Sequence, residues 1–119
     1  MGGFSDPTVN FITYEIIKPP NFPPYFTGEV QKDISINLST MKANQVVTYT
    51  IPSYTDPNWE EVTLTVAHLR DFMHFDGIDT IQFKGMNEKN LGSYIFDLIL
   101  TDKRGMQKIE EVKLNITNK

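Results

Sequence analysis

The fold is decided by residues 91–118, LGSYIFDLILTDKRGMQKIEEVKLNITN, in which two alternating segments flank a short polar turn. Successive side chains of a strand point to opposite faces. One face of this pair of segments therefore collects Tyr94, Phe96, Leu98, Leu100, Val112, Leu114 and Ile116. The pattern predicts a long antiparallel hairpin around a turn at residues 102–105, with one apolar surface laid on a common core, as in a β-sandwich.

Length and composition limit the classes of fold and function that this chain can have. The 119 residues suit one domain with a single core. A net charge of -4 argues against a nucleic-acid surface, which needs clustered Lys and Arg. The absence of cysteine excludes disulfides, thiolate metal sites and cysteine nucleophiles. No apolar run approaches the roughly 18 residues of a membrane span, so we expect no direct membrane insertion.

Short strand patterns recur at regular spacing from Tyr25 onward, and no window of helical length carries an apolar stripe. We predict an all-β Greek-key sandwich of seven strands at 25–30, 33–38, 46–51, 61–67, 80–84, 92–101 and 107–117. Besides the hairpin, the side chains expected inside are Ile34, Ile36, Leu38, Val47, Tyr49, Ile51, Val62, Leu64 and Val66.

The first 20 residues are set apart from this pattern. Residues 1–3, MGG, look like a cloning remnant, and residues 9–17 alternate with Ile12, Tyr14 and Ile16 on one side. A proline-rich stretch, which is stiff and extended, follows at residues 19–24. Residues 4–18 are then either the last strand of a preceding module or a connection within one sandwich, and we favour the first interpretation. The sandwich itself is expected over residues 21–119, as one module of a longer chain.

Four pieces of the chain occur in an order and spacing that resemble a known family. They are residues 55–65 (TDPNWEEVTLT), 69–76 (LRDFMHFD), 81–85 (IQFKG) and 92–105 (GSYIFDLILTDKRG). Together they resemble the cadherin-like domain of dystroglycan type, also described as an immunoglobulin-like module of large surface proteins. The resemblance implies an immunoglobulin-like sandwich in a secreted or cell-surface protein. Three residues depart from the family pattern: Arg70 replaces proline, and Trp59 and Glu60 replace glycine and aspartate.

Hard oxygen ligands gather in two turns of the predicted sandwich. Asp56, Asn58 and Glu60 alternate in one loop, and Asp102 lies in the turn of the hairpin. Such residues can surround a calcium ion, with backbone carbonyls, waters or a neighbouring module completing the shell. The family resemblance points the same way. The alternative is that Asp56 and Asp102 only organise their turns through side-chain oxygens.

Two acceptor sequons for N-linked glycan begin at Asn37 and Asn115. If Leu38 and Ile116 face the core, both asparagines point to solvent. Glycosylation would place the protein in a secretory pathway, although a polar strand face predicts the same pattern.

Two aromatic features have more than one interpretation. Trp59 is either a lid on the core or, if exposed, a contact for a partner. The resemblance implies that the segment with Phe72, Met73 and Phe75 plugs one end of the sandwich. Tyr94, two residues after Gly92, suits a corner where its hydroxyl bonds nearby backbone, or it is a core aromatic with its hydroxyl at the rim.

Catalytic patterns are absent from the sequence. It contains no Gly-x-Ser-x-Gly turn, no phosphate-binding glycine loop and no HExxH zinc helix around its two histidines. We therefore expect no enzyme and no catalytic residues. The favoured function is a structural or adhesion module with neighbouring modules of the same chain as partners. The alternatives are an accessory domain that recognises a protein or a glycan, and an intracellular scaffold domain.

Overall fold

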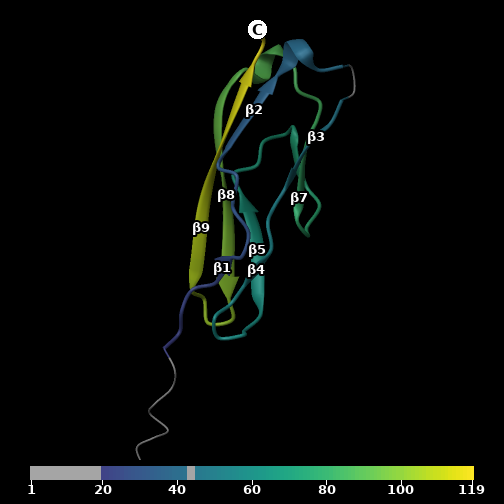
Figure 1. Cartoon of the computed structure of the whole chain (residues 1–119). Helices are drawn as coiled ribbons and strands as arrows, with labels where there is room; N and C mark the ends of the chain where they lie inside the picture. The colour runs from purple at the N-terminus through teal and green to yellow at the C-terminus, as the bar shows by residue number, and fades with distance from the viewer. Residues whose placement is uncertain (1–19, 43–44) are drawn as a thin grey trace, which may run out of the picture.

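The structure, a computed structural model, describes residues 20–42 and 45–119, and these form a nearly all-β sandwich (Figure 1). The predicted strand within residues 9–17 lies outside the described residues. Nine strands follow one another: β1 Tyr25–Phe26, β2 Asp33–Asn37, β3 Val47–Thr50, β4 Tyr54–Thr55, β5 Val62–Ala67, β6 Met73–Phe75, β7 Thr80–Phe83, β8 Gly92–Asp102 and β9 Gln107–Thr117. Two 3₁₀ turns, Leu38–Thr40 and Glu88–Asn90, complete the described elements.

The strands form two facing sheets and one small ladder. One sheet has the order β2-β9-β8-β5, the other has the order β3-β7-β6, and β1 pairs with β4. The long hairpin of β8 and β9 forms the centre of the larger sheet, and β2 runs parallel to β9. This Greek-key arrangement is that of an immunoglobulin-like sandwich, as the sequence predicts.

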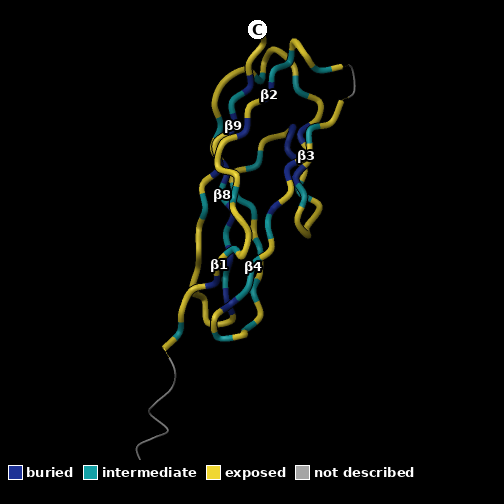
Figure 2. The backbone as a smooth tube through the Cα atoms, viewed as in Figure 1, coloured by how far each residue is buried: buried dark blue, intermediate teal, exposed yellow. Residues whose placement is uncertain are grey.

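The core lies between the sheets, where the alternating residues meet (Figure 2). The inward side chains of the hairpin, from Phe96 to Leu100 and from Val112 to Ile116, are almost fully buried. Phe96 packs against Tyr49 and Phe83 of the facing sheet at ring-centroid distances of 6.0 and 6.2 Å. Offset and edge-on aromatic pairs of this kind fix how two sheets interdigitate.

All seven predicted strands are present, with changes at their ends. The first strand is only Tyr25–Phe26, because residues 27–32 cross from the small ladder to the larger sheet. The sequence missed β4 and β6, which have two and three residues. The inward residues of β5 are half-buried rather than buried, whereas those of β2, the other edge strand of the same sheet, are buried.

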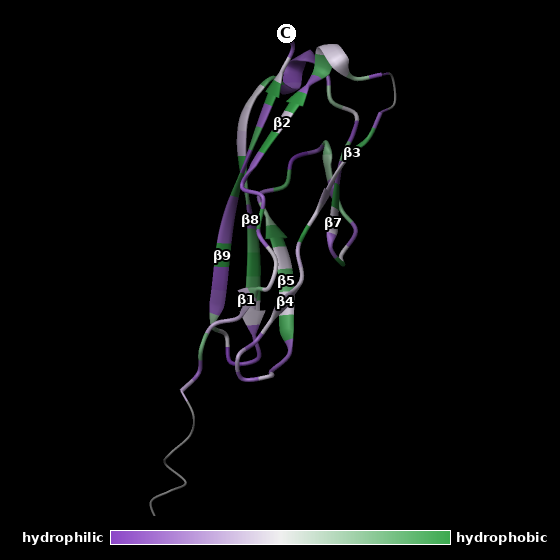
Figure 3. Cartoon of the chain, in the orientation of Figure 1, coloured by the Kyte–Doolittle hydropathy of each residue, from purple (hydrophilic) through white to green (hydrophobic). Residues whose placement is uncertain are grey.

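Polarity along the hairpin follows its neighbours (Figure 3). β8 is largely hydrophobic, whereas the first half of β9 is largely hydrophilic. The register explains this difference, because β2 pairs only with residues 113–117 of β9. In the uncovered half, Glu110 bridges Lys32 and Lys108 at 3.0 and 3.2 Å.

Tyr94 adopts the corner arrangement. Its hydroxyl donates to the backbone carbonyl of Asn90 at 2.8 Å, and its ring packs edge-on against Phe72 at 5.3 Å. Phe72 and Met73 are themselves buried, but Met73–Phe75 form β6, an edge strand paired with β7, so this segment is part of the smaller sheet rather than the end plug that the resemblance implies. Arg70, which departs from the family pattern, lies over the Tyr94 ring at 5.3 Å.

The two ends of the sandwich carry different parts of the chain. The described chain begins at Pro20 near the turn between β8 and β9, and the C-terminus lies at the opposite end (Figure 1). No helix among the described residues is long and apolar enough to cross a membrane.

Candidate metal centre

Asp56 organises the loop between β4 and β5. It is only 2% exposed, and its Oδ1 accepts from the backbone N–H of Asn58 at 2.6 Å. Its carbonyl oxygen accepts from the N–H of Trp59 at 2.9 Å. The turn role predicted for Asp56 is therefore present. The turn uses only Oδ1 of the carboxylate. The second oxygen, Oδ2, has no hydrogen-bond partner among the described residues.

Asp102 closes β8 and shapes the hairpin turn. Its Oδ1 accepts from the N–H groups of Arg104 and Met106 at 2.9 and 2.8 Å, and its Oδ2 accepts from Asn21 Nδ2 at 3.0 Å. Burial acts to raise the pKa of Asp102, but these backbone and side-chain donors outweigh it and lower the pKa below its ordinary value. Asp102 is therefore held as a carboxylate.

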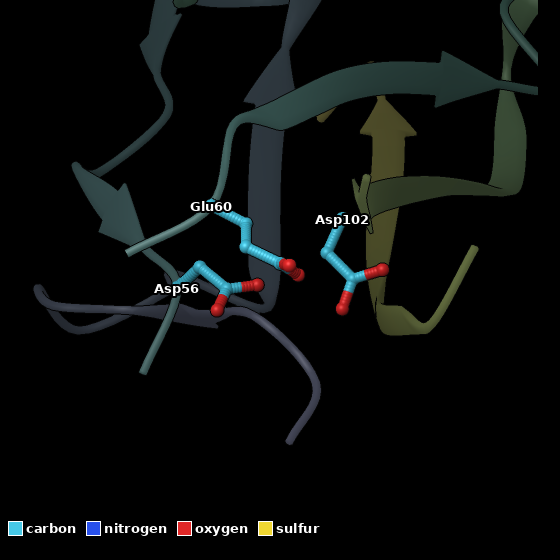
Figure 4. A group of neighbouring side chains, drawn as sticks. All are labelled: Asp56, Glu60 and Asp102. Carbon is cyan, nitrogen blue, oxygen red and sulfur yellow. The ribbon is translucent and has the colours of Figure 1, made fainter. Parts of the chain in front are cut away.

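Glu60 reaches the same place from the end of the loop. Its Oε2 pairs with Arg104 Nε at 2.9 Å. Its Oε1 is buried and accepts no hydrogen bond from any described residue. The guanidinium of Arg104 thus compensates the negative charge at Oε2 of Glu60. The other oxygen, Oε1, lies on the side of the two aspartates (Figure 4).

The three carboxylates converge on one point. One oxygen each of Asp56, Glu60 and Asp102 lie within 4.8 Å of one another, and the side chains point toward a common centre (Figure 4). Asn21 borders this group, because its Nδ2 donates to Asp102 Oδ2 at 3.0 Å, and its Oδ1 is buried without a hydrogen-bond partner within residues 20–42 and 45–119. Within residues 20–42 and 45–119, no other group of three or more His, Asp or Glu side chains converges in this way.

The charge and chemistry of this group fit a divalent cation. Three carboxylates and the Arg104 guanidinium leave a formal charge of -2. Buried polar atoms are normally hydrogen-bonded, so the carboxylate oxygens of Asp56 and Glu60 that lack partners in this group require an explanation. Carboxylate and amide oxygens are the ligands that Ca²⁺ and Mg²⁺ take, and a bound ion of charge +2 would satisfy them all.

Asn58 is the predicted ligand that the structure does not bring into this group. Its Oδ1 accepts from the N–H of Phe22 at 3.0 Å, and its Nδ2 donates to the carbonyl of Pro20 at 3.1 Å. Asn58 therefore joins the start of the described chain, residues 20–24, which we call the linker, to the loop between β4 and β5. Both polar atoms of its side chain are engaged, so none is left for an ion. Asn21 borders the group instead, through its hydrogen bond to Asp102. The sequence carries no spacing signal for it, since 81 residues separate Asn21 from Asp102.

Trp59 does not cover the core, so its interpretation as a lid is wrong. Its side chain is 90% exposed, and its backbone has φ = 60°. A left-handed conformation favours glycine and costs an aromatic residue about 1–3 kcal/mol. The turn held by Asp56 and the ion pair of Glu60 impose this conformation on the residue between them. Trp59 is thus presented to solvent next to the carboxylate group.

Both sequons lie at the end of the sandwich that carries the C-terminus. Asn115 stands on β9 between buried Leu114 and Ile116, and its Oδ1 accepts from Ser93 Oγ at 2.6 Å. Asn37 lies at the end of β2, where its Nδ2 donates to the carbonyl of Lys119 at 3.1 Å. The predicted strand phase is therefore correct for Asn115. The amide nitrogen that would carry a glycan is engaged in Asn37.

Comparison with known proteins identifies a fold. No protein-family model matches the chain, and no curated protein matches it. Among solved structures, an endo-fucoidan hydrolase of glycoside hydrolase family 107 matches with a TM-score of 0.59 at 16% identity, over 86% of this chain. A second structure of that hydrolase, a variant, matches with a TM-score of 0.56 at 15% identity, over 98% of this chain.

The chain spans only 14% of the hydrolase chain in the first match and 16% in the second. The solution structure of the PKD domain from KIAA 1837 protein matches with a TM-score of 0.43 at 13% identity, covering 78% of this chain and 92% of that one. At such identities the likeness concerns the fold alone. The strand order of the two sheets is that of an immunoglobulin-like β-sandwich.

Proposed function

We propose that this chain is a non-catalytic structural module of a larger extracellular protein, stiffened by calcium where the preceding segment joins it. The observation that carries the proposal is the pair of buried oxygens without partners on Asp56 and Glu60, whose carboxylates converge with that of Asp102 beside the buried amide of Asn21. A spacer that binds no ion would be more stable with an apolar or fully hydrogen-bonded cluster at this place.

The residues at this site come from three separate segments. Asn21 belongs to the linker, Asp56 and Glu60 to the loop before β5, and Asp102 to the turn after β8. An ion bound by the carboxylates would fix the loop and the turn that hold the linker at the end of the sandwich. Calcium is favoured over magnesium because it accepts more oxygen ligands in irregular geometry, whereas magnesium retains most of its water.

Titration calorimetry of the full chain with Ca²⁺ and with Mg²⁺ tests this proposal. We expect one calcium site, weaker binding of magnesium, and a large loss of calcium affinity in Asp102→Asn. The matched control is Asp79→Asn, an exposed aspartate of the β6–β7 turn outside the carboxylate group. Equal calcium binding by both variants would contradict the assignment.

Secretion is supported by the position of Asn115 on an outward strand face. Expression in a eukaryotic secretory host, followed by mass measurement before and after glycosidase treatment, checks it. We expect glycan on Asn115 in preference to Asn37, whose amide nitrogen is engaged. Two unmodified sequons would favour the intracellular scaffold alternative.

A second candidate function is recognition of a soluble protein or glycan, and the exposure of Trp59 favours it. Exposed tryptophan is the side chain most enriched at binding hot spots. Titration of Trp59 fluorescence with a panel of oligosaccharides tests this candidate, because the chain contains one tryptophan.

A further inference from the structure

The first half of β9 has a free edge. β2 pairs only with residues 113–117 of β9, and no strand among residues 20–42 and 45–119 pairs with residues 107–111 on the side away from β8. This half of β9 is largely exposed and lies at the margin of the larger sheet (Figure 2). A free strand edge is a template on which another strand can pair. We call residues 107–111 the free edge.

The hydrogen bonds around β9 show which backbone groups the free edge presents. The N–H of Lys113 donates to the carbonyl of Lys32 at 2.8 Å, so Lys113 directs its backbone groups away from β8. In an antiparallel ladder, every second residue of a strand directs its N–H and C=O to the same side. Gln107, Ile109 and Glu111 therefore present their N–H and C=O groups to the free edge.

The side chains of the free edge divide between the two faces of the sheet. Lys108 and Glu110 share the inner face with buried Val112. Ile109 stands on the outer face and is 53% exposed. The free edge thus carries one charge of each sign on its inner face and an exposed apolar side chain on its outer face.

We propose that the free edge pairs antiparallel with the free edge of a second copy of this chain, about a two-fold axis at Ile109. Each Ile109 then lies opposite its symmetry mate, and each Gln107 lies opposite Glu111 of the other copy. These are the residues whose backbone groups point outward, so they form hydrogen-bonded pairs, and each such pair exchanges two N–H···O bonds. The contact is isologous, as in most dimers.

The charges select this register. With the two-fold axis at Ile109, Lys108 of each copy lies opposite Glu110 of the other. Opposite charges in cross-strand pairs are stabilising, and like charges directly opposite are destabilising. An axis one residue earlier would place the two Lys108 side chains opposite each other, and an axis one residue later would do the same for Glu110. Charged side chains often protect an edge from pairing, and here they exclude both neighbouring registers while they favour this one.

The free edge also has the length that this pairing requires. Gln107, the first residue of β9, lies opposite Glu111 in the proposed dimer, and β2 begins only at the next outward-pointing residue, where Asp33 pairs with Lys113. The added strand therefore covers the free edge without overlapping β2. An interface this narrow falls below about 1,200 Å², a size typical of weak and transient complexes, so we expect dimers at concentrations of about 0.1–1 mM.

Analytical ultracentrifugation of the full chain over a range of concentrations tests the pairing. The wild type should form dimers at high concentration. Lys108→Glu and Glu110→Lys should each lower the dimer fraction several-fold, because like charges then lie opposite. An equimolar mixture of the two variants should restore it, since every charge then meets its opposite in the other copy. The matched controls are Lys89→Glu and Glu88→Lys, which exchange exposed charges in the Glu88–Asn90 turn and should leave association unchanged.

A cysteine at the two-fold axis reports the register directly, because the chain contains no other cysteine. Cα atoms of a hydrogen-bonded antiparallel pair lie about 5.5 Å apart, within the range of about 4.4–6.8 Å that a disulfide spans. Ile109→Cys should therefore form a covalent dimer on mild oxidation. The matched control is Ile95→Cys on β8, whose side chain is exposed to a similar extent away from the free edge, and it should stay monomeric.

Circular dichroism of each variant verifies that the sandwich stays folded under the conditions of these experiments. A wild-type chain that remains monomeric at about 1 mM would overturn the proposal, since even a weak interface should be occupied there. A dimer that both charge variants retain, or that their mixture fails to restore, would also overturn it. So would equal cross-linking of Ile109→Cys and Ile95→Cys, which would indicate random collision.

Discussion

Replacement of Asp56 by asparagine tests the carboxylate group, because its expected effect on the free energy of unfolding has one sign in chelator and the opposite sign in calcium. In chelator, the wild-type protein buries Asp56 Oδ2 without a donor beside Glu60 and Asp102. The side-chain amide that Asp56→Asn introduces can keep the oxygen that accepts from Asn58 and can donate its N–H₂ to a neighbouring carboxylate. We therefore expect the substitution to stabilise the protein when no calcium is present.

The magnitude follows from the two terms that the substitution removes. A buried acceptor without a partner costs about 1–3 kcal/mol. Repulsion between unit charges on Asp56 and Glu60, at most 4.8 Å apart, is on the order of 3 kcal/mol at an effective dielectric constant of about 20. Because the side chains can move apart without an ion, we expect a net gain of about 1–3 kcal/mol, with each kcal/mol raising Tm by roughly 4–8 °C.

Calcium should reverse the order. Wild-type protein at a calcium concentration of 100 times Kd should gain about 2.7 kcal/mol, and Asp56→Asn should gain almost nothing because one charged ligand is lost. The assay is thermal unfolding of both proteins in chelator and in calcium, with Asp76→Asn as the control. Asp76 is also a turn aspartate, whose Oδ1 accepts three backbone N–H groups from residues 78–80. An Asp56→Asn protein that is less stable in chelator and responds to calcium like the wild type would refute the reasoning.

Three further changes test the fold. Leu98→Ala should destabilise by about 2–5 kcal/mol in urea unfolding, since Leu98 is fully buried, whereas Ile95→Ala on the outer face of the same strand should cost less than about 1 kcal/mol. Burial, with a contribution from the charge of Glu110, raises the pKa of Tyr49 to about 12. A raised folded-state pKa gives stability that is complete below pH 10 and lost between pH 10 and 12, and a pH series of Tm should show this loss in the wild type but not in Tyr49→Phe. Trp59→Gly should leave Tm equal or raise it by the equivalent of about 1 kcal/mol, because relief of the left-handed backbone exceeds or matches the entropy cost of glycine. A drop in Tm would mean that the indole contacts the core.

Local alternation predicts the strands well where one face is buried. The hairpin of β8 and β9 is the clearest case, since a slip of one residue would turn Phe96 and Leu114 to solvent. β4 and β6 were missed because two or three residues are too few to show a period. The half-burial of β5 has no local signal, since β2, the other edge strand of the same sheet, shows the same alternation and buries its inward residues.

The candidate site was predictable only in part for a related reason. Asp56, Glu60 and Asp102 stand in turns whose residue types suggest oxygen ligands. The exclusion of Asn58 and the position of Asn21 beside Asp102 depend on how residues 20–22 cross the end of the sandwich, and one sequence does not encode such a contact locally. Likewise, nothing in the sequence around Trp59 distinguishes a lid from an exposed side chain.

The composition of the carboxylate group also predicts whether calcium would occupy it outside the cell or in the cytosol. Its side chains supply three charged ligands, and Arg104 neutralises part of that charge. Calcium affinity rises with ligand charge and with rigidity of the site, and modules of extracellular proteins bind with Kd of about 10⁻⁴–10⁻³ M. We expect a Kd in that range, so that millimolar calcium outside the cell would fill about half or more of the sites, whereas the low calcium of cytosol would leave them empty. A Kd near 10⁻⁷ M, typical of cytosolic sensors, would instead support the intracellular alternative, because a site that tight would fill inside the cell.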